Sequence, residues 1–105
     1  MTPEGKLKAD CRKIAKRHGM LFANVEGKNY NGWPDTECGK WPLGSGIVKV
    51  EFKRPGVVLD MADPLDQQVK RIKEIRAAGG LAEWCNSVER WRQIVGLDAD
   101  PLDGL

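Results

Sequence analysis

Residues 47–53 limit the fold of this chain more than any other segment, because their polarity alternates without a break. The apolar positions are Val48, Val50 and Phe52, and the charged positions are Lys49, Glu51 and Lys53. Successive side chains of a β-strand point to opposite faces of its sheet. The alternation therefore predicts a strand with one buried face and one polar face, and Arg54-Pro55-Gly56 is expected to end it.

Helical patterns lie on both sides of this strand. Thr2 is a suitable N-cap, Pro3 suits the first helical position, and Gly19 is a natural end for a first helix. Its expected buried stripe, spaced by three and four residues, is Leu7, Cys11, Ile14, Ala15 and His18. Asp63-Pro64 predicts the start of a second helix, and Gly79-Gly80 its end. The expected buried stripe of that helix is Leu65, Val69, Ile72 and Ile75.

Three further strands are predicted at residues 20–25, 35–38 and 81–85, with a hairpin connection over residues 39–46. A short last helix follows residues 86–89, which resemble a capping box. The resulting order of elements predicts an α/β fold, in which helices flank a mixed central sheet. The 105 residues suffice for one domain, expected over residues 1–97, followed by an acidic tail over residues 98–105.

The small numbers of cysteine and histidine residues limit which metal sites and catalytic groups the protein can contain. Cys11, Cys38 and Cys85 are widely spaced and odd in number, which favours buried thiols in a reducing compartment over disulfides or a zinc site. His18 is the only histidine and is expected to be a packed or capping residue. We find no signal peptide and no apolar stretch that could cross a membrane. We therefore expect a cytoplasmic protein with no membrane partner.

The net charge of +2 hides an uneven distribution. The last eight residues contain three aspartates and no base, so residues 1–97 carry +5. Basic residues gather within residues 6–17 and within residues 70–76, where Lys70, Arg71 and Lys73 lie on the second helix. Such groups are typical of proteins that bind a phosphate backbone, but solvated helix faces have the same composition.

Glu51 and Lys53 are the first candidates for catalysis. They are two residues apart on a strand, so their side chains project from one face. A carboxylate there can hold Mg²⁺, and a lysine can position water or stabilise charge on a phosphodiester during hydrolysis. Asp35, preceded by Gly32-Trp33-Pro34, is expected at the start of the neighbouring strand, where it and Glu51 can converge on one cation. Each motif alone has an ordinary structural explanation, as a solvated strand face or a turn.

Together these motifs resemble the virus-type replication-repair nuclease (VRR-NUC) domain of the PD-(D/E)xK nuclease superfamily. The matching residues are Gly32-Trp33-Pro34-Asp35, Glu51-Phe52-Lys53-Arg54-Pro55-Gly56, and Gln68 followed 11 residues later by Gly79. The resemblance covers nearly the whole chain. It implies a restriction-endonuclease-like core with the element order αβββαβ, which agrees with the order predicted above.

The resemblance also implies roles for individual residues. Asp35, Glu51 and the backbone carbonyl of Phe52 would hold Mg²⁺ or Mn²⁺, and Lys53 would be the catalytic lysine. Gln68, rather than Gln67, would organise the active site. Glu4 on the first helix would complete the metal or water shell. Glu37 departs from the usual pattern, and either joins the site or is solvated.

The implied function is a metal-dependent DNA endonuclease that acts on branched DNA, such as Holliday junctions or flaps. Lys70, Arg71 and Lys73 would grip the DNA backbone, and Trp33 would stack on a base unless it packs in the core. Small stand-alone relatives often pair, so a homodimer is expected. Two alternatives remain: a nucleic-acid-binding module of the same fold without activity, and a non-enzymatic interaction domain.

Overall fold

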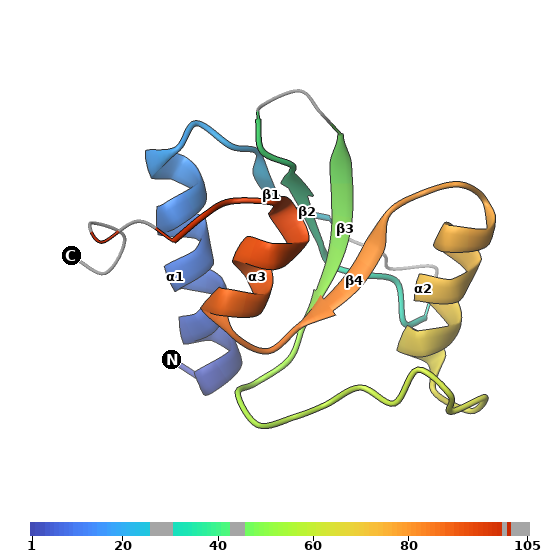
Figure 1. Cartoon of the computed structure of the whole chain (residues 1–105). Helices are drawn as coiled ribbons and strands as arrows, with labels where there is room; N and C mark the ends of the chain where they lie inside the picture. Colours follow the sequence, from blue (N-terminus) through green and yellow to red (C-terminus); the bar gives the residue numbers. More distant parts are fainter. Residues whose placement is uncertain (26–30, 43–45, 100, 102–105) are drawn as a thin grey trace.

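The computed structural model describes residues 1–25, 31–42, 46–99 and 101. The helices and strands follow one another along the chain in the order predicted from the sequence (Figure 1). The elements are α1 (Pro3–Arg17), β1 (Phe22–Asn24), β2 (Thr36–Gly39), β3 (Ile47–Phe52), α2 (Gln67–Ala77), β4 (Ala82–Cys85) and α3 (Val88–Val95). The α/β class and the αβββαβ core are confirmed.

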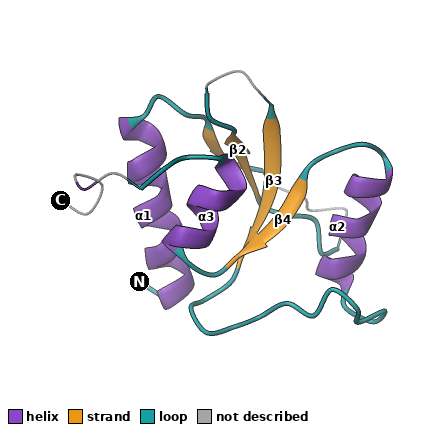
Figure 2. Ribbon diagram, viewed as in Figure 1, coloured by secondary structure: helices purple, strands orange, loops and turns teal. Residues whose placement is uncertain are grey.

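The four strands form one sheet in the order β1-β2-β3-β4 (Figure 2). The first three strands are a meander of antiparallel neighbours, whereas β4 pairs with β3 in parallel, so the sheet is mixed. A parallel pair needs a long crossover connection, and here α2 lies within that connection. The register pairs Thr36 with Val50 and Glu51 with Trp84.

Helices cover the two faces of the sheet unequally. Helices α1 and α3 lie beside each other on one face, and α2 lies on the other face next to β4 (Figure 1). The apolar residues of β3 predicted from the alternation are buried under α1 and α3, together with the fully buried Trp91. A second, smaller cluster joins α2 to β4 through Val69, Ile72, Ile75 and Ala82, with Leu59 from the preceding loop.

The predicted features of α1 are confirmed. The hydroxyl of Thr2 accepts a 3.0 Å hydrogen bond from the amide of Gly5, and Leu7, Cys11, Ile14 and Ala15 are buried. His18 is the C-cap residue, and its ring makes an edge contact with Trp41 at 5.9 Å between centroids. All three cysteines are free and buried, as expected.

The predicted start of the second helix is wrong by three residues. Asp66, not Asp63, is the N-cap of α2, and its carboxylate accepts hydrogen bonds from the amides of Gln68 and Val69. Asp63 instead accepts a 2.9 Å hydrogen bond from the amide of Leu65, which closes a turn before the helix. Leu65 therefore lies outside the helical stripe and is 87% exposed.

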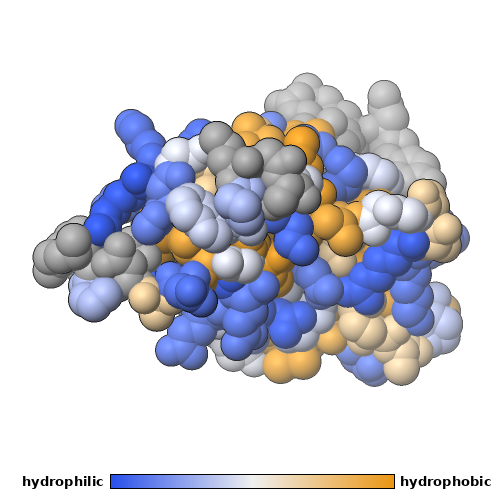
Figure 3. Space-filling view, turned by 45° about the horizontal axis from the view of Figure 1, so that its top comes forward, coloured by the Kyte–Doolittle hydropathy of each residue, from blue (hydrophilic) through white to orange (hydrophobic). Residues whose placement is uncertain are grey.

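Polar residues cover much of the surface, with smaller apolar areas between them (Figure 3). Leu97 is buried in the first cluster, and Asp98 and Ala99 are exposed. The rest of the predicted tail, apart from Pro101, lies outside the described residues, as do part of the segment between the predicted strands 20–25 and 35–38 and part of the hairpin connection over residues 39–46. Within the described ranges, no helix has the length and apolar character needed to span a bilayer.

Candidate active site

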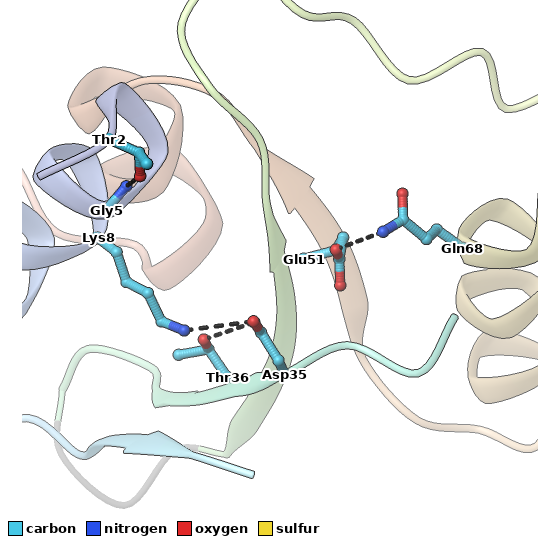
Figure 4. Close-up of polar contacts among 7 residues, drawn as sticks. All are labelled: Thr2, Gly5, Lys8, Asp35, Thr36, Glu51 and Gln68. Carbon is cyan, nitrogen blue, oxygen red and sulfur yellow. Dashed lines mark hydrogen bonds and ion pairs between the residues drawn. The ribbon is translucent and has the colours of Figure 1, made fainter. Parts of the chain in front are cut away.

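Glu51 is the central residue of the candidate site. It lies on β3 between the buried Val50 and Phe52, but its side chain points to the opposite face, towards α2. The residue is only 8% exposed, which is unusual for a carboxylate. Its Oε1 atom accepts a 2.7 Å hydrogen bond from Nε2 of Gln68, in the first turn of α2 (Figure 4). The choice of Gln68 over Gln67 therefore agrees with the structure.

Asp35 lies beside Glu51 because of the strand register. Thr36 of β2 pairs with Val50 of β3 in antiparallel orientation, so the residue before Thr36 is placed next to the residue after Val50. The carboxylate of Asp35 accepts two hydrogen bonds, from the hydroxyl of Thr36 at 3.0 Å and from Nζ of Lys8 at 3.3 Å (Figure 4). The predicted convergence of Asp35 and Glu51 is thus present in the fold.

The surroundings of Glu51 raise its pKa to about 7 from an ordinary value of 4.5. Burial is the largest cause, because it disfavours the charged form, and the negative charge of Asp35 is the second. Glu4 raises this pKa further, whereas Lys53 and Lys8 lower it. Three carboxylates and two ammonium groups therefore lie close enough to interact electrostatically at one end of the sheet.

Lys53 follows the last residue of β3 and is half-buried. Its backbone amide donates a 2.8 Å hydrogen bond to the carbonyl of Cys85, which continues the pairing with β4. Within the described part of the chain, its side chain makes no ion pair. The ammonium group is therefore available to a bound ligand beside Glu51.

Sequence reasoning missed Lys8 as a member of this site. Glu4 and Lys8 are four residues apart on α1, so they lie on the same face of the helix. The side chain of Lys8 is 24% exposed, and its ammonium group contacts Asp35 across the space between α1 and β2. The spacing from Glu4 could have indicated Lys8, but only if α1 was already known to face the site.

Gly32 allows the segment that contains Asp35 to approach α2. Its φ angle is +78°, in the left-handed region that favours glycine. A Cβ atom at Gly32 would lie 2.6 Å from the carbonyl carbon and oxygen of Gln67. The close approach of these two segments therefore requires glycine at position 32.

Glu37 is not part of this arrangement. Its carboxylate forms an ion pair with Lys49, the residue opposite it on β3, and both side chains are partly buried. The ion pair settles the alternatives left open for Glu37: the residue is neither freely solvated nor directed at Glu51.

The four residues expected to contact DNA have different surroundings. Lys70 and Lys73 are exposed on α2. Arg71 is bound within the protein: it donates to the carbonyl of Asn31 at 2.8 Å and pairs with Glu74 at 2.9 Å. Trp33 is partly buried against the α2 cluster, and the ammonium of Lys49 lies 5.8 Å from the centre of its ring. Arg71 therefore joins α2 to the segment before Asp35, and Trp33 packs at the margin of the α2 cluster.

The donor set of the site suits a hard divalent cation. Mg²⁺ is typically held by one or two carboxylates and keeps several of its waters. Asp35 and Glu51 provide such a pair, and a bound cation would offset the burial and the negative charge of Asp35 that raise the pKa of Glu51. Among residues 1–25, 31–42, 46–99 and 101, no three His, Cys, Asp or Glu side chains are grouped so that they could hold a metal. Asp35 and Glu51 therefore fit a metal site in which the protein supplies few ligands and water supplies the others.

The helices, the mixed sheet and the paired carboxylates define a compact α/β fold with a site at the end of β3. Among known proteins, a solved structure described as a VRR_NUC domain resembles this chain with a TM-score of 0.72 and 21% sequence identity. The match covers 91% of this chain and 97% of that one. No family model and no curated protein matches the sequence. The chain thus has the fold of a VRR-NUC domain, as the sequence resemblance implied.

Proposed function

We propose that this protein is a metal-dependent DNA endonuclease that hydrolyses phosphodiester bonds. The observation that supports it most directly is the group formed by Asp35, Glu51, Lys53 and Gln68, which three separate sequence motifs supply and which lies at one end of the sheet. The name of the structurally similar protein, a VRR_NUC domain, supports the same activity.

Asp35, Glu51 and the carbonyl of Phe52 would hold Mg²⁺ or Mn²⁺. A cation bound there would polarise the phosphate and make a water molecule more acidic. Gln68 fixes the Glu51 carboxylate through Oε1 and leaves Oε2 for a ligand. Lys53 would stabilise the negative charge that develops on the phosphate, or orient the attacking water. Glu4 would complete the hydrogen bonding around that water.

We propose branched DNA as the substrate, such as the Holliday junctions and flaps that arise in repair and recombination. The exposed Lys70 and Lys73 on α2 would contact the backbone of one arm. A chain of 105 residues covers little DNA by itself, so we propose that the active form is a homodimer with two sites.

One experiment tests the activity. The purified protein is incubated with a labelled four-way junction and with linear duplex, in Mg²⁺, Mn²⁺ or EDTA. Lys53→Ala and Asp35→Ala are compared with Lys6→Ala, a control that removes an exposed lysine paired with Asp10 on α1. We expect metal-dependent cutting by the wild type and by Lys6→Ala, but not by the two site variants.

Absence of cutting by the wild type, or equal cutting by all variants, would refute the endonuclease proposal. Binding of the junction without cutting would support the inactive nucleic-acid-binding module instead. Absence of binding would support the interaction domain. Analytical ultracentrifugation of the same samples measures whether the protein is a dimer.

A further inference from the structure

A small hollow lies between α1 and β1, next to the candidate active site. Its volume is about 150 Å³, against roughly 30 Å³ for one water molecule in the liquid. It can therefore hold a phosphate group together with some water. Its lining residues are Gly5, Lys8, Ala9, Arg12, Phe22 and Asn24.

Among the residues that the structure describes, the charged side chains that line this hollow are both basic. Lys8 and Arg12 are four residues apart, so they extend from the same face of α1, and no carboxylate of the described ranges lines the hollow. By contrast, a larger groove along α2 contains Lys70 and Lys73 but also Asp63 and Glu74, whose charges oppose them. An anion is thus favoured more clearly beside α1 than beside α2.

The shape of the hollow comes from small and fixed residues. Gly5 and Ala9 have no long side chains, so they leave space between the two basic residues. The ring of Phe22 packs against Phe52 and Trp91, with centroids 5.9 and 6.5 Å apart, which fixes the β1 wall. Asn24 adds an amide that can donate a hydrogen bond to an anion.

Lys8 joins the hollow to the active site, because it lines the hollow while its ammonium contacts Asp35 at 3.3 Å. Arg12 makes no ion pair within the described part of the chain and is exposed to solvent. One cation is therefore shared with the site and the other is available to a ligand. A nucleic-acid strand that enters the site from α1 would meet Arg12 and then Lys8.

We infer that this hollow is a subsite for a backbone phosphate of the DNA strand, next to the phosphate at the candidate active site. Arg12 and Lys8 supply the positive charge, and Asn24 supplies a neutral donor. The inference rests on the proposed function for the identity of its ligand. Its test uses binding in EDTA, so that it does not depend on cutting.

The first measurement is the affinity for a short labelled duplex, determined by fluorescence anisotropy in EDTA at several salt concentrations. We expect Arg12→Ala to weaken binding about fivefold, as for an exposed charge pair. It should also reduce the slope of log K against log salt by about one. Arg12→Lys keeps the charge and should restore most of the affinity. Lys13→Ala is the matched control, because it removes an exposed charge from the same helix without touching the hollow.

The second measurement locates the bound phosphate. Amide chemical shifts are followed by NMR while the duplex, or inorganic phosphate alone, is added to the wild type and to Arg12→Ala. We expect the duplex to shift the amides of Gly5, Ala9 and Asn24 in the wild type but not in Arg12→Ala. Inorganic phosphate should shift the same amides only at much higher concentration, because it lacks the rest of the backbone.

Equal affinities and salt slopes for Arg12→Ala and Lys13→Ala would overturn the subsite. So would shifts confined to α2, or a response of the hollow to inorganic phosphate but not to DNA. If these measurements fail while the wild type still cuts DNA, only the subsite is wrong. If they succeed and no cutting occurs, the subsite stands and the endonuclease proposal falls.

Discussion

Gln68 and Glu51 meet across the boundary between α2 and β3, where Nε2 of the amide donates a 2.7 Å hydrogen bond to Oε1 of the carboxylate. The N-cap Asp66 orients the first turn of α2, so the position of the amide depends on the start of that helix. A carboxylate held in this way presents its other oxygen in a fixed direction. Gln68 is therefore a positioning residue for Glu51.

Gln68→Ala should weaken the binding of Mn²⁺ and the rate of DNA cutting by about tenfold, the lower end of the range for residues that orient metal ligands. The cause is the loss of the hydrogen bond that holds Glu51. Calorimetric titration with Mn²⁺ measures the binding directly. Gln67→Ala is the matched control, since that neighbouring side chain is exposed. Equal effects of the two variants would refute the positioning role.

The raised pKa of Glu51 makes the metal-free fold less stable at high pH. Below pH 4.5 the carboxyl is protonated in both the folded and the unfolded chain. As pH rises from 4.5 to about 7, the unfolded chain loses this proton while the folded chain keeps it, so stability falls and then levels off. Glu51→Gln removes this loss of stability, because glutamine does not ionise. In EDTA at pH 8 it should be more stable than the wild type by up to about 3 kcal/mol.

Urea unfolding of both proteins at pH 4.5 and pH 8 measures the effect. The advantage of Glu51→Gln should be large at pH 8 and nearly absent at pH 4.5. If the free energies of unfolding of the two proteins differ by the same amount at both pH values, Glu51 has the same pKa in the folded and in the unfolded chain, and the prediction is wrong.

Divalent metal should stabilise the protein more at pH 8 than at pH 6. The cation competes with the proton on Glu51, and a ligand that binds only the folded state raises the unfolding temperature. Thermal unfolding is measured without Mg²⁺ and at increasing Mg²⁺ concentrations up to the order of millimolar, which suits a weak site. The shift in the unfolding temperature is then compared at each pH. Asp35→Ala should abolish the shift. A shift that persists unchanged in that variant would place the metal elsewhere.

Lys8→Ala should strengthen the binding of Mn²⁺ in the absence of DNA by about two- to fivefold, because it removes an ammonium that occupies Asp35. The same variant should weaken the binding of DNA in EDTA, because it removes a charge from the hollow beside α1. Lys6→Ala, whose ammonium pairs with Asp10 instead, should change neither quantity. Weaker binding of Mn²⁺ by Lys8→Ala would contradict this prediction.

Gly32→Ala should destabilise the fold by about 2–3 kcal/mol, because the new Cβ would collide with the backbone of Gln67 at 2.6 Å in addition to straining a φ of +78°. Gly56→Ala provides the control. Its φ is +89° and a Cβ there meets nothing within 4 Å, so only the backbone strain of about 1 kcal/mol is expected. Urea unfolding compares the two variants, and equal losses would rule out the collision.

The sequence predicts a residue's position in the fold where that position follows from a local pattern, such as the alternation of a strand or the length of a hairpin. The alternation in β3 placed Glu51 on the polar face, and the hairpin spacing placed Asp35 beside it. The start of α2 was misplaced because Asp63 and Asp66 are both suitable N-caps, and only packing against the sheet distinguishes them. Lys8 is missed by sequence reasoning, and the internal contact of Arg71 is not predicted, because their partners, Asp35 and Asn31, lie 27 and 40 residues away along the chain.

The side chains of the candidate site come from α1, from the residue just before β2, from β3 and the residue after it, and from α2, and they extend along the sequence from Glu4 to Gln68. The parallel pairing of β3 with β4 follows later still in the chain. During synthesis, a ribosome-bound chain that has emerged only as far as β3 contains Asp35 and Glu51 but lacks the helix that holds Glu51 in place. Any activity of this site therefore begins late, after the crossover has docked on the sheet.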